Sequence, residues 1–180
     1  MTAATAGLGP SLVWVMSELF SFPNPINEKA ARVVAGVVAL ASTLALLTGW
    51  RWLLIPLAYG FIARAATGPA LSPLGRVAMS VVGPRLGEPK RVAGPPKRFA
   101  QAIGAVCTTL GAIFAFGLGW STAADVLLGV MVVFATLESV FAVCVGCKMF
   151  AVLMRLGVIP PEVCESCNNI WARVPAPDQA

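Results

Sequence analysis

The sequence predicts an all-α integral membrane protein whose four transmembrane helices form two hairpins, with a short interfacial helix at each end. Apolar residues make up 58% of the chain and charged residues only 12%, a composition outside the range of soluble domains. The apolar residues gather into runs long enough for a membrane span, which needs about 20 residues. Charges interrupt these runs at Arg64 and Glu138 alone, and the runs cover 33–50, 52–75, 99–124 and 126–147.

The elements follow in order along the chain. Residues 1–23 mix apolar and polar side chains, which is typical of an arm that lies at the membrane interface. Residues 24–146 form the predicted membrane domain. Its four spans are expected at 30–49, 52–68, 99–119 and 123–146. A linker rich in Gly and Pro is expected at 69–98, between the second and third spans. A cysteine-bearing segment at 147–171 and a tail at 172–180, which is predicted to be disordered, complete the chain.

The two predicted hairpins resemble each other. Each begins with a basic entry, has a Gly-Trp pair at its outer turn, and carries one ionisable residue in its second helix, Arg64 or Glu138. This pattern predicts a parallel two-plus-two internal repeat.

The basic residues predict the orientation in the membrane. Of the 13 Lys and Arg residues, all except Arg51 fall on one side of the predicted arrangement. Positive charge marks the cytoplasmic side, so we expect a plasma (inner) membrane protein with both termini and the linker in the cytoplasm. Trp50, Trp52 and Trp120 gather at the opposite interface, where tryptophan is enriched. The net charge of +5 favours anionic lipids as partners. The basic segment 85–98 lacks the interleaved aromatic residues of a nucleic-acid-binding surface.

Four of the five cysteines form two Cys-x-x-Cys pairs near the end of the chain. Cys144 and Cys147 make the first pair, Cys164 and Cys167 make the second, and sixteen residues separate the two. A turn at Pro160-Pro161 is expected to fold the second pair back toward the first. The chain contains no His, which excludes His-ligated haem and Ser-His-Asp hydrolysis. Cysteine chemistry remains.

The cysteine spacing has two interpretations. Four thiolates hold one zinc or iron ion as a structural staple, or the pairs act as dithiol/disulfide couples that relay electrons or sulfur to a soluble partner. Lys148 predicts a lowered pKa for the neighbouring Cys147 and therefore favours Cys147 as the attacking thiol. The residues alone do not decide between an enzyme and a non-enzymatic scaffold or transporter subunit stapled by zinc.

Three further residues stand out within the predicted spans. Glu138 lies deep in the last span, where an unpaired carboxylate is costly, and Arg64 is its expected partner from the other hairpin. Cys107 is expected at a similar depth, lining the same cavity. The pair sets the helix register in one interpretation and forms a proton or sulfur-anion site in the other.

The entry residues and both cysteine pairs give residues 24–171 a resemblance to a bacterial family. The motifs that carry it are Arg32, Lys97-Arg98-Phe99-Ala100, Cys144-Val-Gly-Cys147-Lys148 and Cys164-Glu-Ser-Cys167. The family comprises small four-helix membrane proteins, common in actinobacteria and catalogued as a domain of unknown function. Some members are encoded near thioredoxin-like proteins and rhodanese-type sulfurtransferases, so the resemblance implies a partner of that kind and a role in thiol redox or sulfur trafficking. It implies no catalytic residue and is compatible with a homo-oligomer.

Overall fold

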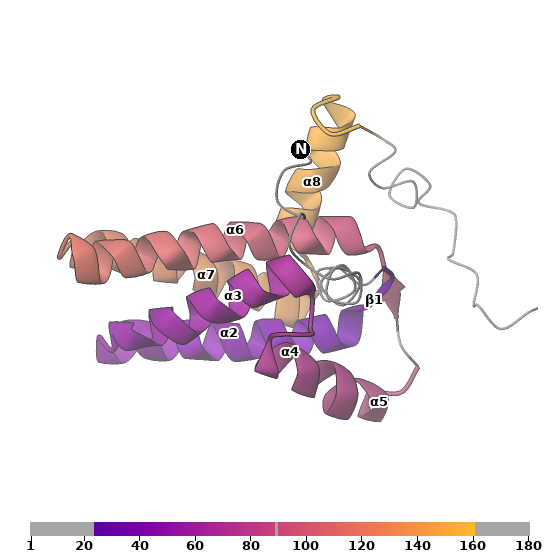
Figure 1. The fold of residues 1–180 in the computed structure, drawn as a ribbon, viewed down its shortest axis with the longest axis horizontal. Helices are drawn as coiled ribbons and strands as arrows, with labels where there is room; N and C mark the ends of the chain where they lie inside the picture. Colours follow the sequence, from indigo (N-terminus) through magenta and orange to yellow (C-terminus); the bar gives the residue numbers. More distant parts are fainter. Residues whose placement is uncertain (1–23, 89, 161–180) are drawn as a thin grey trace, which may run out of the picture.

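The computed structural model describes residues 24–88 and 90–160, which are mostly helical (Figure 1). Four long segments run side by side along the long axis of the molecule, and a fifth helix leaves them steeply. They are α2 (Glu28–Thr48), α3 (Leu54–Thr67), α6 (Gly94–Ala112) continued by η3 (Ile113–Gly117), α7 (Ser121–Phe141) and the steep helix α8 (Val145–Arg155). The predicted all-α class is therefore confirmed. The predicted arm at 1–23 and the tail at 172–180 lie outside the described residues.

Short elements connect the long helices. They are η1 (Arg51–Leu53) before α3, then α4 (Pro73–Val77), η2 (Ala78–Val82) and α5 (Gly83–Arg85) after it, and the strands β1 (Ile26–Asn27) and β2 (Arg91–Val92). The two strands pair antiparallel, and Asn24 Oδ1 accepts a hydrogen bond from the Gly94 N–H at 3.0 Å. These bonds hold the starts of α2 and α6 together. α6 begins at Gly94 rather than at residue 99, because proline fits the first turn of a helix.

The end of α7 differs from the predicted fourth span. The helix stops at Phe141 rather than at residue 146, because Ala142 adopts a left-handed conformation with φ 57°. The Arg32 guanidinium of α2 donates hydrogen bonds of 2.9 and 3.1 Å to the Ser139 carbonyl, which has no partner further along the helix. The chain therefore leaves the bundle just before the first cysteine pair.

Each long helix packs most closely on a helix from the other half of the chain. α2 packs along α7 and α3 along α6, whereas α2 and α3 contact each other little. The same capping contact occurs in both halves. Arg32 of α2 caps the end of α7, and Arg98 of α6 donates to the Ala65 carbonyl near the end of α3 at 2.9 Å. The helices of each predicted hairpin thus make their main contacts with the other half of the chain.

Three helices in the described part of the chain are long and apolar enough to cross a membrane, namely α2, α6 with η3, and α7. α3 has 14 residues, fewer than the roughly 20 that a span needs. Large apolar side chains cover the outside of these helices, including Leu40, Leu47, Ile62, Val126 and Val133. An apolar outer surface is what lipid requires, so these helices suggest a membrane protein.

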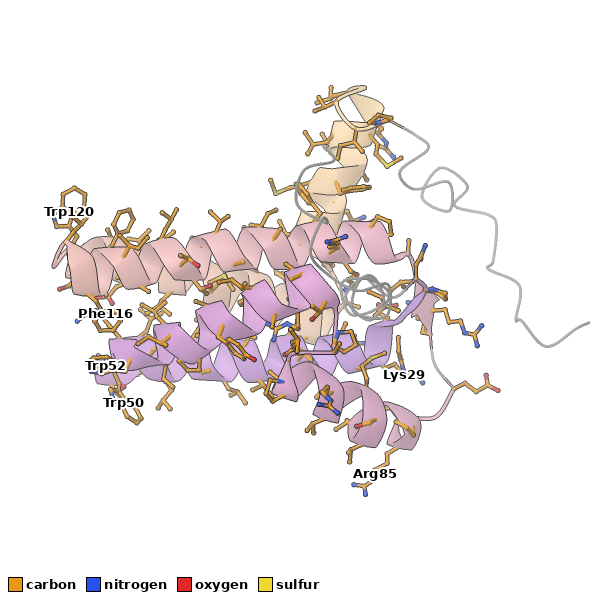
Figure 2. All side chains as sticks on the ribbon, viewed as in Figure 1. Lys29, Trp50, Trp52, Arg85, Phe116 and Trp120 are labelled. Carbon is orange, nitrogen blue, oxygen red and sulfur yellow. The ribbon has the colours of Figure 1, made fainter. Side chains whose placement is uncertain are left out.

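The two ends of the bundle differ in composition. Figure 2 shows Trp50, Trp52, Phe116 and Trp120 at one end and Lys29 and Arg85 at the other. At the aromatic end, the Arg51 guanidinium and the Asp125 carboxylate form an ion pair at 2.7 Å. The one basic residue predicted on the tryptophan side therefore has its charge balanced.

Candidate functional site

Cys144 and Cys147 lie where the bundle meets α8. Cys144 is the N-cap of α8, with an extended backbone, and its carbonyl accepts a hydrogen bond from the Lys148 N–H at 3.1 Å. Cys147 follows within the first turn of the helix. Cys144 is buried, Cys147 is half-buried, and both are free thiols. Their spacing across one helical turn brings the two side chains together on one face.

Gly146, between the two cysteines, lets α8 approach α6 closely. A Cβ atom at Gly146 would lie 2.5 Å from Ala100 Cβ and 2.7 Å from Ala100 Cα. One turn further along α8, the buried Phe150 packs edge-on against Phe99 of α6, with ring centroids 5.7 Å apart. The sequence pattern does not single out Gly146, because the need for glycine comes from α6 and not from the motif.

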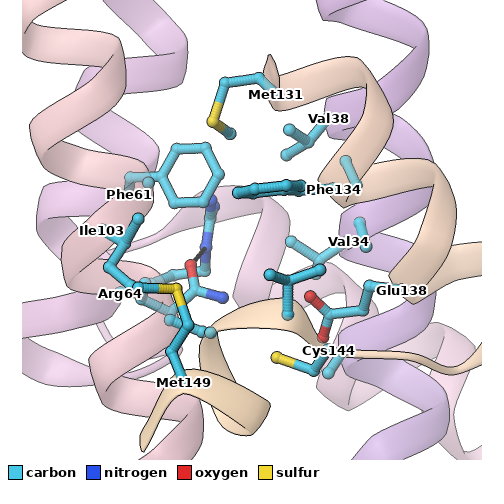
Figure 3. A pocket seen from close by; sticks show the side chains of 18 residues that line it. Val34, Val38, Phe61, Arg64, Ile103, Met131, Phe134, Glu138, Cys144 and Met149 are labelled. Carbon is cyan, nitrogen blue, oxygen red and sulfur yellow. Dashed lines mark hydrogen bonds between the residues drawn. The ribbon is translucent and has the colours of Figure 1, made fainter. Parts of the chain in front are cut away.

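A buried ion pair lies beside the dithiol. The Lys97 Nζ, near the start of α6, donates to Glu138 Oε1, near the end of α7. Lys97 is only 7% exposed. Figure 3 shows the Glu138 carboxylate next to the Cys144 side chain. The sequence did not predict Lys97 as a site residue, because a basic residue at the start of a span is usually a topology signal.

The two thiols differ in acidity. The pKa of Cys144 is lowered because the Cys147 thiol donates a hydrogen bond to its sulfur, and the Lys97 ammonium adds to this effect against burial and the Glu138 charge. The same hydrogen bond, together with burial, raises the pKa of Cys147. Lys148, whose side chain is exposed, was expected to make Cys147 the more acidic thiol. The structure instead favours Cys144, at the positive end of the α8 dipole.

Arg64 is not the ion-pair partner of Glu138, so that prediction was wrong. Its guanidinium donates to Gln101 Oε1 at 2.8 Å and to Ser72 Oγ at 3.2 Å, and it lies 4.7 Å from the centroid of the Phe61 ring. The reason is the helix arrangement. α3 packs along α6 and not along α7, so Lys97 of α6 is the cation that meets Glu138.

A cavity of about 60 Å³ lies between the four long helices and the start of α8 (Figure 3). Its walls are mostly apolar, and its polar side chains include Arg64, Gln101, Glu138 and Cys144. A cavity needs about 10–15 Å³ to hold one water molecule, so this cavity has room for a few. Cys107, on the described part of α6, is not among the residues that line the cavity, contrary to expectation.

The second cysteine pair, Cys164 and Cys167, lies outside the described residues. Within residues 24–88 and 90–160, no group of three or more His, Cys, Asp or Glu side chains is placed to hold a metal ion. The predicted zinc or iron site needs all four cysteines and therefore stays a prediction.

The family model described as "Domain of unknown function (DUF4395)" matches residues 26–155 of this chain. This range contains all the long helices and the first cysteine pair. No curated protein and no solved structure matches the chain.

Proposed function

Since the chain belongs to the DUF4395 family, whose description assigns no activity, we propose from the site that it is a membrane protein that performs thiol–disulfide exchange with a soluble partner. The observation that carries this proposal is a pair of free thiols at the start of α8, beside the Lys97–Glu138 ion pair. A hydrogen bond from the Cys147 thiol lowers the pKa of Cys144 and makes the pair unequal. The thiolate is the reactive form of cysteine. A dithiol with one acidic member is suited to attack first with that member and to resolve with the other.

The exchange proceeds in two steps. The Cys144 thiolate attacks one sulfur of the partner's disulfide, whose S–S bond breaks, and the partner's other sulfur leaves as a thiolate. Cys147 then gives its proton to the first partner thiolate and attacks the Cys144 sulfur, so that the Cys144–partner bond breaks and the Cys144–Cys147 disulfide forms. The second partner sulfur leaves as a thiolate and takes a proton from water, which completes the partner dithiol. Two electrons pass from the pair to the partner, and the reverse sequence reduces the pair.

The resemblance to the family supports a thioredoxin-like protein or a rhodanese-type sulfurtransferase as the partner. A sulfurtransferase would make the same thiolate the acceptor in a sulfur relay. In this proposal Cys164 and Cys167 form a second couple that exchanges with the first. A zinc-stapled scaffold or transporter subunit is the competing function. Thiol reactivity with a small disulfide, together with the zinc content of the protein, distinguishes the two functions.

We also propose four spans, with η1 and α3 together forming the second, and both termini on the cytoplasmic side of the plasma membrane. The aromatic residues at one end of the bundle and the basic residues at the other support this orientation (Figure 2). In that frame, the dithiol lies at the cytoplasmic surface, close to anionic lipid headgroups.

The orientation predicts which engineered cysteine a membrane-impermeant maleimide reaches on intact cells. Ser121→Cys, at the exposed start of α7, is expected to gain labelling over wild type. Glu88→Cys, in the exposed linker, is expected to gain it only after the cells are lysed. Labelling of Glu88→Cys but not of Ser121→Cys on intact cells would reverse the orientation.

The thiol assignment predicts different reactivities for two single variants. The probe is cystamine, a small disulfide that suits a largely buried thiol. At pH 7, Cys147→Ser keeps the acidic Cys144 and a hydroxyl donor beside it, so it is expected to form the mixed disulfide about threefold faster than Cys144→Ser or more, because its larger thiolate fraction outweighs the lower nucleophilicity of an acidic thiolate. Its rate should level off at a pH below the ordinary thiol pKa of about 8.5. Peptide mass spectrometry locates the adduct.

Cys107→Ser is the matched control and should behave as wild type. Equal rates for Cys144→Ser and Cys147→Ser would contradict the unequal pair. Stoichiometric zinc in the wild type, released equally by replacing any of the four paired cysteines, would favour the structural staple.

A further inference from the structure

Arg64 is a buried charge that the dithiol chemistry does not use. The residue is 7% exposed. Its contacts are the Gln101 amide, the Ser72 hydroxyl and the Phe61 ring, all of which are neutral. Neutral dipoles compensate the loss of water around a buried cation only in part, so the buried guanidinium keeps an unfavourable desolvation energy.

The charges around Arg64 do not balance. Glu138 acts on Arg64 through space, but its carboxylate is already ion-paired with Lys97. Among the described residues, and with Cys144 as a neutral thiol, Arg64, Lys97 and Glu138 therefore place two positive charges against one negative charge inside the bundle. An additional anion would remove this imbalance.

Two cavities meet at Arg64 and Gln101. The first is the central cavity beside Cys144, and the second, also about 60 Å³, is lined by Lys97 as well. Each has room for a few waters or for one small ion. Because Gln101 Oε1 is bound to the Arg64 Nε, its amide N–H groups remain as donors for a ligand. Guanidinium, ammonium and amide N–H groups together form a donor set for an anion.

The second cavity lies near the basic end of the bundle. Its wall includes Ile26, Gly68, Pro69 and Met79, which belong to the segments at the basic end of the bundle. Figure 2 shows Lys29 and Arg85 at that end. An excess of positive charge raises the local concentration of anions, so small anions would gather at this end of the bundle.

We propose that Arg64, Lys97 and Gln101 form a binding site for a small monovalent anion of the size of chloride. The bound anion compensates the buried guanidinium and fills space between α2, α3 and α6. The cavity volume excludes large organic anions. The site belongs to the form of the protein in which Cys144 is a neutral thiol, and its test reads chloride binding and not thiol reactivity, so either proposal can fail without the other.

The test uses the full-length protein in detergent and the ³⁵Cl NMR line width, with chloride titrated against gluconate at constant ionic strength. The wild type is expected to broaden the chloride line in a saturable way, and bromide should reverse the broadening. Arg64→Gln is expected to lose the saturable part. Arg76→Gln, which removes an exposed arginine of α4, should retain it and serves as the matched control.

A second variant covers the case in which Arg64→Gln does not fold. Ala31 lines both cavities, so Ala31→Leu fills them while all three charges stay in place. It is expected to lose the saturable broadening as well. No saturable broadening in the wild type, or equal broadening in the wild type and a folded Ala31→Leu protein, would overturn the proposal.

Discussion

Replacing Lys97 with Met is expected to destabilise the protein by about 3–5 kcal/mol, because it leaves the Glu138 carboxylate buried without its ion-pair partner. Glu138→Gln leaves Lys97 unpaired and should cost a similar amount. The double variant removes both charges, so it should be destabilised by much less than the sum of the two. The measurement is the free energy of unfolding in detergent, taken for the four proteins of this cycle.

A second cycle with Arg64, the partner of Glu138 that the sequence predicts, serves as the control. Arg64→Gln combined with Glu138→Gln should show a clearly smaller interaction energy, because Arg64 bonds to Gln101 and Ser72 and meets Glu138 only through space. Additive effects of Lys97→Met and Glu138→Gln would show that the two side chains do not meet in the folded protein.

Gly146→Ala is expected to push α8 away from α6 and to destabilise the site by about 1–3 kcal/mol. The added Cβ would meet the Ala100 Cβ at 2.5 Å and the Ala100 Cα at 2.7 Å, and backbone cannot move aside as a flexible side chain does. Since Cys144 occupies the N-cap position of α8, the displacement should also reduce the reaction of Cys144 with cystamine.

Gly129→Ala is the matched control for this substitution. Gly129 lies inside α7, and a Cβ there would have no heavy atom within 4 Å. The change should therefore stabilise the protein slightly, by about 0.4–1 kcal/mol. Amide hydrogen exchange across residues 145–155 provides the readout. The same exchange rates in the two alanine variants would disprove the close docking of α8 on α6.

The sequence by itself determined the helices and the difference between the two ends of the bundle. Long apolar runs can satisfy their backbone hydrogen bonds only within a helix when lipid surrounds them, and this holds whatever the neighbours are. Tryptophan and basic residues mark the two ends for the same local reason, since each side chain responds to the depth at which it lies. The pairing of Cys144 with Cys147 is also local, because their spacing is one helical turn.

Only the tertiary structure decided which side chains meet across helices. Glu138 pairs with Lys97 and not with Arg64, because α3 packs along α6 while α7 packs along α2. The acidity of Cys144 depends on the Cys147 thiol and on Lys97, which lies 47 positions earlier in the chain. Local sequence cannot specify such contacts. Apolar helices in lipid pack through shape, small residues and a few polar contacts, and those depend on every neighbouring helix at once.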